Sequence, residues 1–357
     1  MQTSYAFLIA LGLSLALTPL VRRLALLVGA VAYPNDRSVH KLPIPLLGGV
    51  AIYVSSVAAI LLSRPLDAVA ERAVIFGGFV ILAVGMVDDF ISLKPWQKLL
   101  GQVVSAVVVI AAGVSISFLT NPFNGTLAVL GLLGIPLTLG WVVSFENLVN
   151  LSDGLDGLAA GIAGITATVM VFASAKAGAF GIPPAAAAIA GSVVGFLPYN
   201  FHPASIFMGD AGAMYLGLAL AVLSVQGLVK SAVFMSVLAP ILTMMVPISD
   251  AAFAIVRRRL TGQPVSQADH DHLHHRLLEL GIGQRKAVLS IYLVSLVFGA
   301  LGFVSGFVPV SSGGPIAGLA VLGLFAAAYR AGLLTINARR NGKGQSGQAK
   351  KEVWGSR

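Results

Sequence analysis

Long apolar segments recur along the whole chain and limit its fold more than any other feature. Of the 357 residues, 57% are hydrophobic and only 10% are charged, whereas about a quarter of the residues in a soluble domain carry a charge. A segment in lipid has to satisfy its own backbone hydrogen bonds, and an α-helix does so. The sequence therefore predicts an all-α polytopic membrane protein.

Eleven apolar segments are candidates to cross a bilayer, and the third and seventh of them are short. They lie at 5–32, 47–62, 73–87, 97–118, 127–148, 158–177, 184–197, 213–228, 231–256, 287–308 and 315–336. The first carries its arginines after the apolar stretch, so it is predicted to be a retained span and not a signal peptide. An odd number of spans places the two ends of the chain on opposite sides of the membrane.

The basic residues predict the orientation. With the N-terminus outside, 19 of the 23 Lys and Arg residues fall on the inner side, as the positive-inside rule requires, and the C-terminus is then cytoplasmic. This distribution accounts for the net charge of +9, so no nucleic-acid partner is expected. We expect residues 1–336 to form one transmembrane catalytic domain, including a cytoplasmic loop at 257–286, and residues 337–357 to form a basic, disordered cytoplasmic tail.

The acidic residues share that inner side. Twelve of the 14 Asp and Glu residues fall there, although the rule for Lys and Arg makes no such demand of them. A bound divalent cation is the simplest explanation. The chain has no cysteine, which excludes disulfides and thiolate metal sites.

One polar motif follows directly on an apolar segment. It places Asn147, Asn150, Asp153 and Asp156 three positions apart. Acidic groups at membrane depth are costly unless they line a cavity, bind a cation or carry protons. Two glycines within the motif disfavour a continuing helix. We predict a helix that ends here in an irregular turn facing a metal or a phosphate.

Two further carboxylates, Asp88 and Asp89, end an apolar segment. Together they could hold a cation, or one could act as a base whose neighbour tunes its pKa. The alternative is an ordinary polar helix end, which the helix dipole disfavours because negative charge belongs at the other terminus. Lys98 could bind phosphate as a compact charge or could simply anchor the helix at the interface.

A lone carboxylate, Asp210, lies between two glycines just before an apolar segment. An N-cap for the following helix is its alternative role. Its resemblance to the other Asp and Gly loops of the inner side favours a functional one.

The longest inner loop holds a string of histidines, His270, His272, His274 and His275, followed by Arg276. Zinc binding is one interpretation, because imidazole is a common zinc ligand. The spacing does not match a closed zinc site, and the last three of these residues would make a better cradle for a diphosphate.

The inner side of the membrane thus holds acidic side chains that could bind a metal and basic side chains that could bind phosphate. This combination suits the transfer of a phosphate-containing group, which depends on charge neutralisation and positioning. A nucleotide could reach this side from the cytoplasm and a lipid acceptor from the bilayer. A secondary transporter, with the carboxylates as ion or proton sites, is the alternative from another class. It is disfavoured by the grouping of the acids at one face and by the lack of paired interrupted spans.

With these motifs in place, the chain resembles the polyprenyl-phosphate N-acetylhexosamine-1-phosphate transferases. The matching motifs are Asp88-Asp89-Phe90, NLVNLSDGLDGL from Asn147, PYNFHPASIFMGDAGA from Pro198 and DHLHHRLLELG from Asp271. The histidine string is similar to that of the undecaprenyl-phosphate N-acetylglucosamine-1-phosphate transferase branch. The phospho-N-acetylmuramoyl-pentapeptide transferase branch, with three consecutive histidines, is the alternative. One departure from the branch is Leu46, where many members carry Arg.

The resemblance implies site residues in three groups. Catalytic roles are implied for Asp88, Asp89, Asp153, Asp156 and His274. Substrate contacts are implied for Lys98, Asn147, Asp156, Asn200, Phe207, His272, His274, His275 and Arg276. Asn150 and Asp210 are implied as Mg²⁺ ligands.

The resemblance also implies the partners. They are a UDP-N-acetylhexosamine, undecaprenyl phosphate and the lipid bilayer, with Mg²⁺ as cofactor, Mn²⁺ as its substitute, and a homodimer as one option for the assembly. The expected location is the bacterial inner (plasma) membrane, with the active site on the cytoplasmic face.

Overall fold

Helices form almost all of the secondary structure. The computed structural model describes residues 1–34, 43–64, 68–120, 126–231, 235–260 and 273–307, with two short helical pieces at 318–319 and 322–323. The helices are α1 (Gln2–Leu27), α2 (Gly48–Ser63), α3 (Ala68–Arg72), α4 (Gly78–Ile91), α5 (Pro95–Ala111), α6 (Gly134–Leu151), α7 (Leu158–Lys176), α8 (Ile182–Asn200), α9 (Gly209–Ser231), α10 (Met235–Thr243), α11 (Met245–Leu260), α12 (Leu273–Glu279) and α13 (Gln284–Val304).

Within the described residues, seven helical runs are long and apolar enough to cross a membrane, and α2 and α5 are shorter apolar helices. A π-helical turn at Ala73–Gly77 joins α3 to α4, so that 68–91 forms one of these runs. The predicted class, an all-α polytopic membrane protein, is confirmed. The count of eleven spans and their orientation stay predictions, and the segments at 315–336 and 337–357 lie almost wholly outside the described residues.

Two short antiparallel hairpins, which the sequence did not predict, interrupt the helices. One pairs β1 (Val31–Ala32) with β2 (Ile44–Pro45). The other pairs β3 (Phe118–Thr120) with β4 (Leu127–Val129). The predicted span at 127–148 therefore begins too early, since its first residues form a strand and α6 begins at Gly134.

The predicted span at 231–256 is also divided, because α10 and α11 are separated at Met244. Pro247 explains the break, since it has no backbone N–H to donate to the carbonyl of Thr243. Small breaks of this kind free backbone groups and change the direction of a helix.

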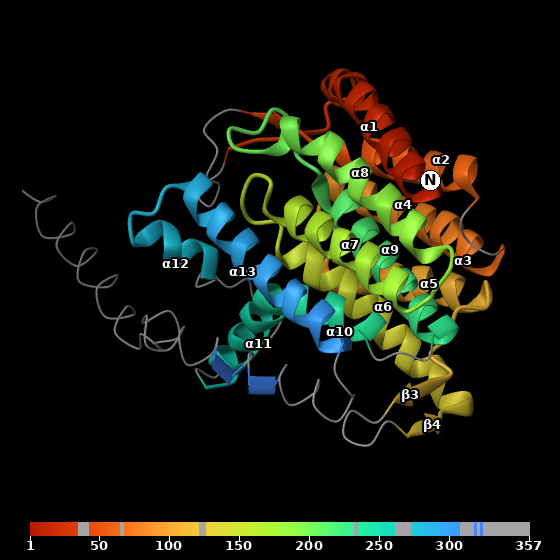
Figure 1. Cartoon of the computed structure of the whole chain (residues 1–357). Coiled ribbons are helices and arrows are strands. Elements are labelled where there is room, and N and C mark those ends of the chain that lie inside the picture. The colour runs from red at the N-terminus through yellow and green to blue at the C-terminus, as the bar shows by residue number, and fades with distance from the viewer. Residues whose placement is uncertain are drawn as a thin grey trace, which may run out of the picture.

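Helix α9 is the centre of the bundle, and 94% of the residues in its 18-residue apolar stretch are buried. It packs against α4 and α6 most extensively and also against α2, α7, α8 and α10, and Figure 1 shows it behind α7 and α8. Its first turn comes very close to two neighbours. A Cβ on Gly49 would collide with the backbone of Gly212, and one on Gly85 with that of Ala211. Small residues allow such approaches between membrane helices, and here they fix the start of α9 against α2 and α4.

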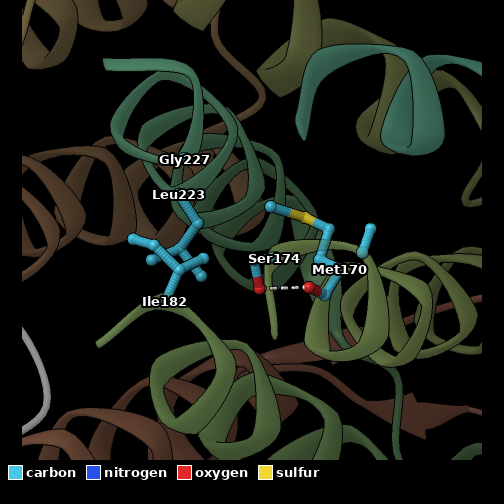
Figure 2. A pocket seen from close by; sticks show the side chains of 6 residues that line it. Met170, Ser174, Ile182, Leu223 and Gly227 are labelled. Carbon is cyan, nitrogen blue, oxygen red and sulfur yellow. Dashed lines mark hydrogen bonds between the residues drawn. The ribbon is translucent and has the colours of Figure 1, made fainter. Parts of the chain in front are cut away.

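A small apolar pocket lies among α7, α8 and α9. Met170, Ile182 and Leu223 line it, and it is too tight to hold a water molecule. Its one hydroxyl, on Ser174, donates back to the carbonyl of Met170 in the preceding turn (Figure 2). With no polar group turned into it, this pocket offers nothing to a charged substrate.

Candidate active site

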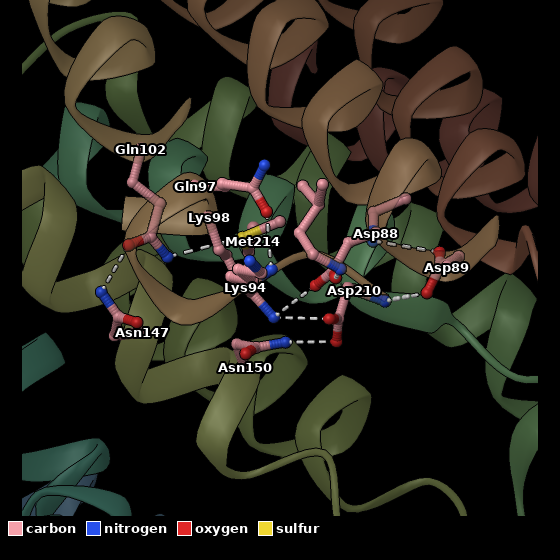
Figure 3. A network of polar contacts seen from close by, with 12 residues as sticks. Asp88, Asp89, Lys94, Gln97, Lys98, Gln102, Asn147, Asn150, Asp210 and Met214 are labelled. Atoms are coloured by element: carbon pink, nitrogen blue, oxygen red, sulfur yellow. Dashed lines mark hydrogen bonds and ion pairs between the residues drawn. The ribbon is translucent and has the colours of Figure 1, made fainter. Parts of the chain in front are cut away.

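Four helix ends meet at one end of the bundle and bring together residues that are far apart in the sequence. The end of α4 supplies Asp88 and Asp89, the start of α5 supplies Lys98, the end of α6 supplies Asn150 and the start of α9 supplies Asp210. Figure 3 shows these side chains converging.

The carboxylate of Asp210 is the hub of this cluster. Its Oδ2 pairs with the ammonium of Lys98, and its Oδ1 accepts a hydrogen bond from Asn150 Nδ2 at 2.6 Å. Lys98 Nζ also lies 3.0 Å from Asp88 Oδ2. The side chain of Asp88 is 9% exposed, that of Lys98 18% and that of Asp210 33%, so the cluster is reachable from outside through Asp210.

The short link between α4 and α5 sets the position of Lys98. Asp88 Oδ1 accepts the N–H of Leu93 at 2.6 Å, so Asp88 closes the link with one oxygen and holds the lysine with the other. The side chain of Gln97 accepts the N–H of Lys94 at 2.9 Å and caps the start of α5, as the third residue of a capping box does. Lys98 is thereby held in the first turn of α5.

Asp89 points away from Lys98 and caps α9. Its Oδ1 accepts the N–H of Asp210 at 2.9 Å and its Oδ2 that of Ala211 at 3.4 Å. A carboxylate at a helix N-terminus satisfies free donors and complements the helix dipole. The capping role that the sequence offered as the alternative for Asp210 is thus filled from another helix, and the Asp210 side chain is left to Lys98 and Asn150.

The turn at 152–157 carries Asp153 beside this cluster. Asp153 is partly buried. Burial, together with the carboxylates of Asp210, Asp89 and Asp156, raises the pKa of Asp153 to about 8. Carboxylates outnumber cations in this described part of the chain, so the site favours added positive charge.

Asp156 binds a histidine that the sequence analysis did not single out. Its Oδ2 lies 2.8 Å from His202 Nδ1 and accepts the N–H of Ala204 at 3.1 Å. His202 is a histidine within the PYNFHPA motif, and that position was the only available sign of it. Arg285 donates through Nε to the His202 carbonyl at 2.9 Å, which ties α13 to the same loop.

The loop before α9 is held by Asn200 and Phe207. Asn200 is 2% exposed and donates to the carbonyl of Ile206 at 3.1 Å. The Phe207 backbone accepts from Gly48 at 3.0 Å and donates to Pro45 at 2.8 Å. Both residues, for which the resemblance implies substrate contacts, therefore also shape the loop, and the buried side chain of Asn200 faces the protein.

Three of the remaining predicted residues, His274, His275 and Arg276, belong to α12. Asp250 Oδ1 accepts the N–H of Leu273 at 2.9 Å and caps that helix. A small cavity lined by Ser152, Asp250 and Leu273, among others, places α12 next to the turn that carries Asp153. Arg276 is half-buried on α12. His272 lies outside the described residues, as do the side chains of His274 and His275.

The donors at this site suit a hard cation. The described residues contain no group of three His, Cys, Asp or Glu side chains placed to hold a metal. Asp88 and Asp210 nevertheless share one cationic group, the Lys98 ammonium, and carboxylate and amide oxygens are the ligands that Mg²⁺ prefers. Asn150 presents its amide nitrogen to Asp210 here, so ligation through its oxygen would need the amide to turn.

Comparison with known proteins shows the family of the chain. The chain matches the family described as Glycosyl transferase family 4 over residues 72–228, a stretch that contains the whole cluster on Asp210. It is 40% identical to the "Probable undecaprenyl-phosphate N-acetylglucosaminyl 1-phosphate transferase" of Bacillus subtilis (strain 168), over 82% of this chain and 82% of that protein.

Two other relatives cover similar shares. The decaprenyl-phosphate N-acetylglucosaminephosphotransferase of Mycolicibacterium smegmatis is 40% identical over 76% of this chain and 74% of its own. The phospho-N-acetylmuramoyl-pentapeptide-transferase of Desulforudis audaxviator is 32% identical over 83% of this chain and 95% of its own.

The apolar helical runs together with these relatives show a multi-pass membrane enzyme, a phosphoglycosyl transferase. Over most of its length it is similar to proteins named as N-acetylglucosamine phosphate transferases. The chain belongs to glycosyl transferase family 4.

Proposed function

We propose that this protein transfers N-acetylglucosamine 1-phosphate from UDP-N-acetylglucosamine to undecaprenyl phosphate and releases UMP. The observation that carries the proposal is the cluster on Asp210, where Lys98, Asn150 and Asp88 meet at one end of the helices. The names of the relatives at 40% identity support the choice of sugar and of a polyprenyl phosphate acceptor. The product is a lipid-linked sugar diphosphate, a starting unit for cell-envelope polysaccharides.

The chemistry is a displacement at phosphorus. An oxygen of the lipid phosphate forms a bond to the sugar-bearing phosphorus, the bond from that phosphorus to the UMP oxygen breaks, and UMP leaves with the electron pair. Such reactions depend on positioning and on neutralising charge. Lys98 supplies one fixed positive charge for the phosphates, and Asp88 and Asn150 orient the groups around Asp210.

Mg²⁺ belongs to the proposal as the cofactor. Asp210, Asp88 and, after rotation of its amide, Asn150 would hold it, and Mn²⁺ is expected to substitute because it takes the same oxygen ligands. When bound, the ion spreads the negative charge that develops on the phosphate oxygens.

The direction of attack is testable. A direct attack inverts the configuration at a chiral phosphorus, whereas a covalent intermediate on an aspartate would give net retention through two displacements. We expect inversion, and retention would refute the direct route.

The site is proposed to face the cytoplasm of a bacterial cell from within the plasma membrane. The predicted distribution of Lys and Arg supports this orientation, since the predicted spans place 19 of the 23 on that side. A nucleotide sugar from the cytoplasm and a membrane-bound lipid phosphate could then both reach the cluster.

The experiment uses the purified protein in detergent with Mg²⁺, undecaprenyl phosphate and a panel of UDP-sugars. Release of UMP with UDP-N-acetylglucosamine, dependent on the lipid, is the expected result. Asp210→Asn should lose turnover while it remains folded. Activity only with the UDP-linked muramoyl pentapeptide would favour the peptidoglycan branch, and no UMP with any sugar would favour a transporter.

A further inference from the structure

Behind the cluster on Asp210, α5 faces α6 through a stack of polar side chains, which are buried except for the partly buried Asn147. Gln102 and Ser105 follow Lys98 on α5 by four and seven positions, and Asn147 and Glu146 precede Asn150 on α6 by three and four. Residues at these spacings lie on one face of a helix. Each helix therefore presents a column of polar side chains. The column on α5 reaches the candidate active site at Lys98, and the column on α6 reaches it at Asn150.

The first layer of this stack is an amide pair. Asn147 Nδ2 donates to Gln102 Oε1 at 2.8 Å and to the carbonyl of Val143 at 2.8 Å. A carboxamide has two N–H donors, so both donors of Asn147 are used within the protein. Gln102 is 1% exposed, and its Nε2 lies 3.5 Å from the sulfur of Met214, one turn after Asp210 on α9.

This layer therefore joins the three helices that carry Lys98, Asn150 and Asp210 (Figure 3). Lipid gives no hydrophobic force to hold helices together, so polar contacts and close packing set their relative position.

The second layer pairs a serine with a buried acid. Ser105 Oγ lies 2.6 Å from Glu146 Oε1 and 2.7 Å from the carbonyl of Gln102, and both side chains are fully buried. Serine has one hydroxyl proton and a carbonyl can only accept. Both contacts can be separate two-centre hydrogen bonds only if Glu146 brings a proton of its own, because the serine then donates to Gln102 and accepts from Glu146. The other oxygen of Glu146 has no partner among the described residues, as suits an uncharged acid better than a carboxylate.

We propose that Gln102 and Asn147, supported by the neutral pair of Ser105 and Glu146, are positioning residues that set the separation of α5 and α6. This separation holds Lys98 against one oxygen of Asp210 and Asn150 against the other. The inference rests on the proposed function, since the positioned groups are those that would neutralise the phosphates. It gives Asn147 a role behind the site in place of a direct substrate contact.

The kinetic test replaces each amide by an apolar side chain of similar size. Gln102→Leu and Asn147→Leu should each lower kcat by about ten-fold and change KM for the UDP-sugar by less than about two-fold, because a small misplacement of catalytic groups costs rate. The double variant should be little worse than either single one, since the two residues act as one pair. A raised KM in Asn147→Leu alone would overturn the proposal in favour of substrate binding.

A reciprocal exchange provides the rescue. Gln102→Asn is one methylene too short and Asn147→Gln one too long, whereas the two together keep the combined length of the pair. We expect both single variants to be impaired and the double variant to recover most of the rate. Ser144→Ala, an exposed position on α6, is the control.

Glu146→Gln keeps size and neutrality and should retain the rate, and a loss above about ten-fold there would refute the neutral layer.

A second measurement is independent of turnover. Lys98 is shielded by its two carboxylate partners, so an amine-acylating reagent should label it slowly in the wild type. Gln102→Leu and Asn147→Leu should speed that labelling by about three-fold or more, as read by peptide mass spectrometry against the other lysines. Unchanged labelling in both variants would refute positioning. If the wild type releases no UMP, the proposed function fails while this result still decides the inference.

Discussion

Substitution of Asp89 can distinguish a structural role of this residue from a catalytic one. Its carboxylate accepts the N–H groups of Asp210 and Ala211 at the start of α9. Loss of an N-cap costs about 0.5–2 kcal/mol, and a negative charge at a partly buried helix N-terminus contributes up to about 2 kcal/mol. The two effects overlap. We therefore expect Asp89→Ala to lower the free energy of unfolding by about 2 kcal/mol and Asp89→Asn, which keeps one acceptor, by about 1 kcal/mol.

The assay is unfolding in mixed detergent micelles, followed by circular dichroism, with kcat measured on the same samples. Turnover should fall in the same order as stability, since the cap also places Asp210. Glu71→Gln, which removes an acid near the opposite end of the helical run 68–91, is the matched control and should change neither quantity. If Asp89→Ala unfolds like the wild type and yet shows no turnover, Asp89 acts on the substrate and the capping argument is wrong.

Three further predictions concern neighbouring groups. Lys98→Met should reduce kcat on the order of 100-fold because it removes the fixed charge offered to the phosphates, and Lys98→Arg should recover part of it; equal rates in all three proteins would contradict this. Because the folded-state pKa of Asp153 is raised from its ordinary value of 3.8 to about 8, the folded protein holds a proton that the unfolded chain releases, so the contribution of Asp153 to stability falls as pH rises from about 4 to 8. The gap in unfolding free energy between wild type and Asp153→Asn should shrink or reverse over that window, and parallel curves would exclude the shift. For Asp156 and His202, a double-mutant cycle with Asp156→Asn and His202→Ala should show a coupling of about 0.5–3 kcal/mol in unfolding free energy, whereas additive losses would mean that their contact is incidental.

The sequence alone determined the class of the protein and the places where its chemistry gathers. A bilayer leaves helices as the available spans for segments like these, so a low charge content and repeated apolar runs lead directly to a polytopic bundle. Polar residues such as Asp88, Asn150 and Asp210 are easy to recognise because the segments beside them are almost wholly apolar. In the structure these residues come together at helix ends.

Only the tertiary structure decided what each of these side chains touches. Asp88 and Asp89 are adjacent in sequence, but successive residues on a helix point about 100° apart, so one meets Lys98 and the other caps α9. Asn147 resembles Asn150 in the motif, yet its side-chain amide donates a hydrogen bond to Gln102, which lies 45 residues away. His202 lies in a recognised motif but had no role assigned to it, and Glu146 gave no recognisable pattern. Their partners are Asp156, in the turn at 152–157, and Ser105, on α5, which lie 46 and 41 residues away. Packing across the bundle brings these pairs together, and no local spacing records it.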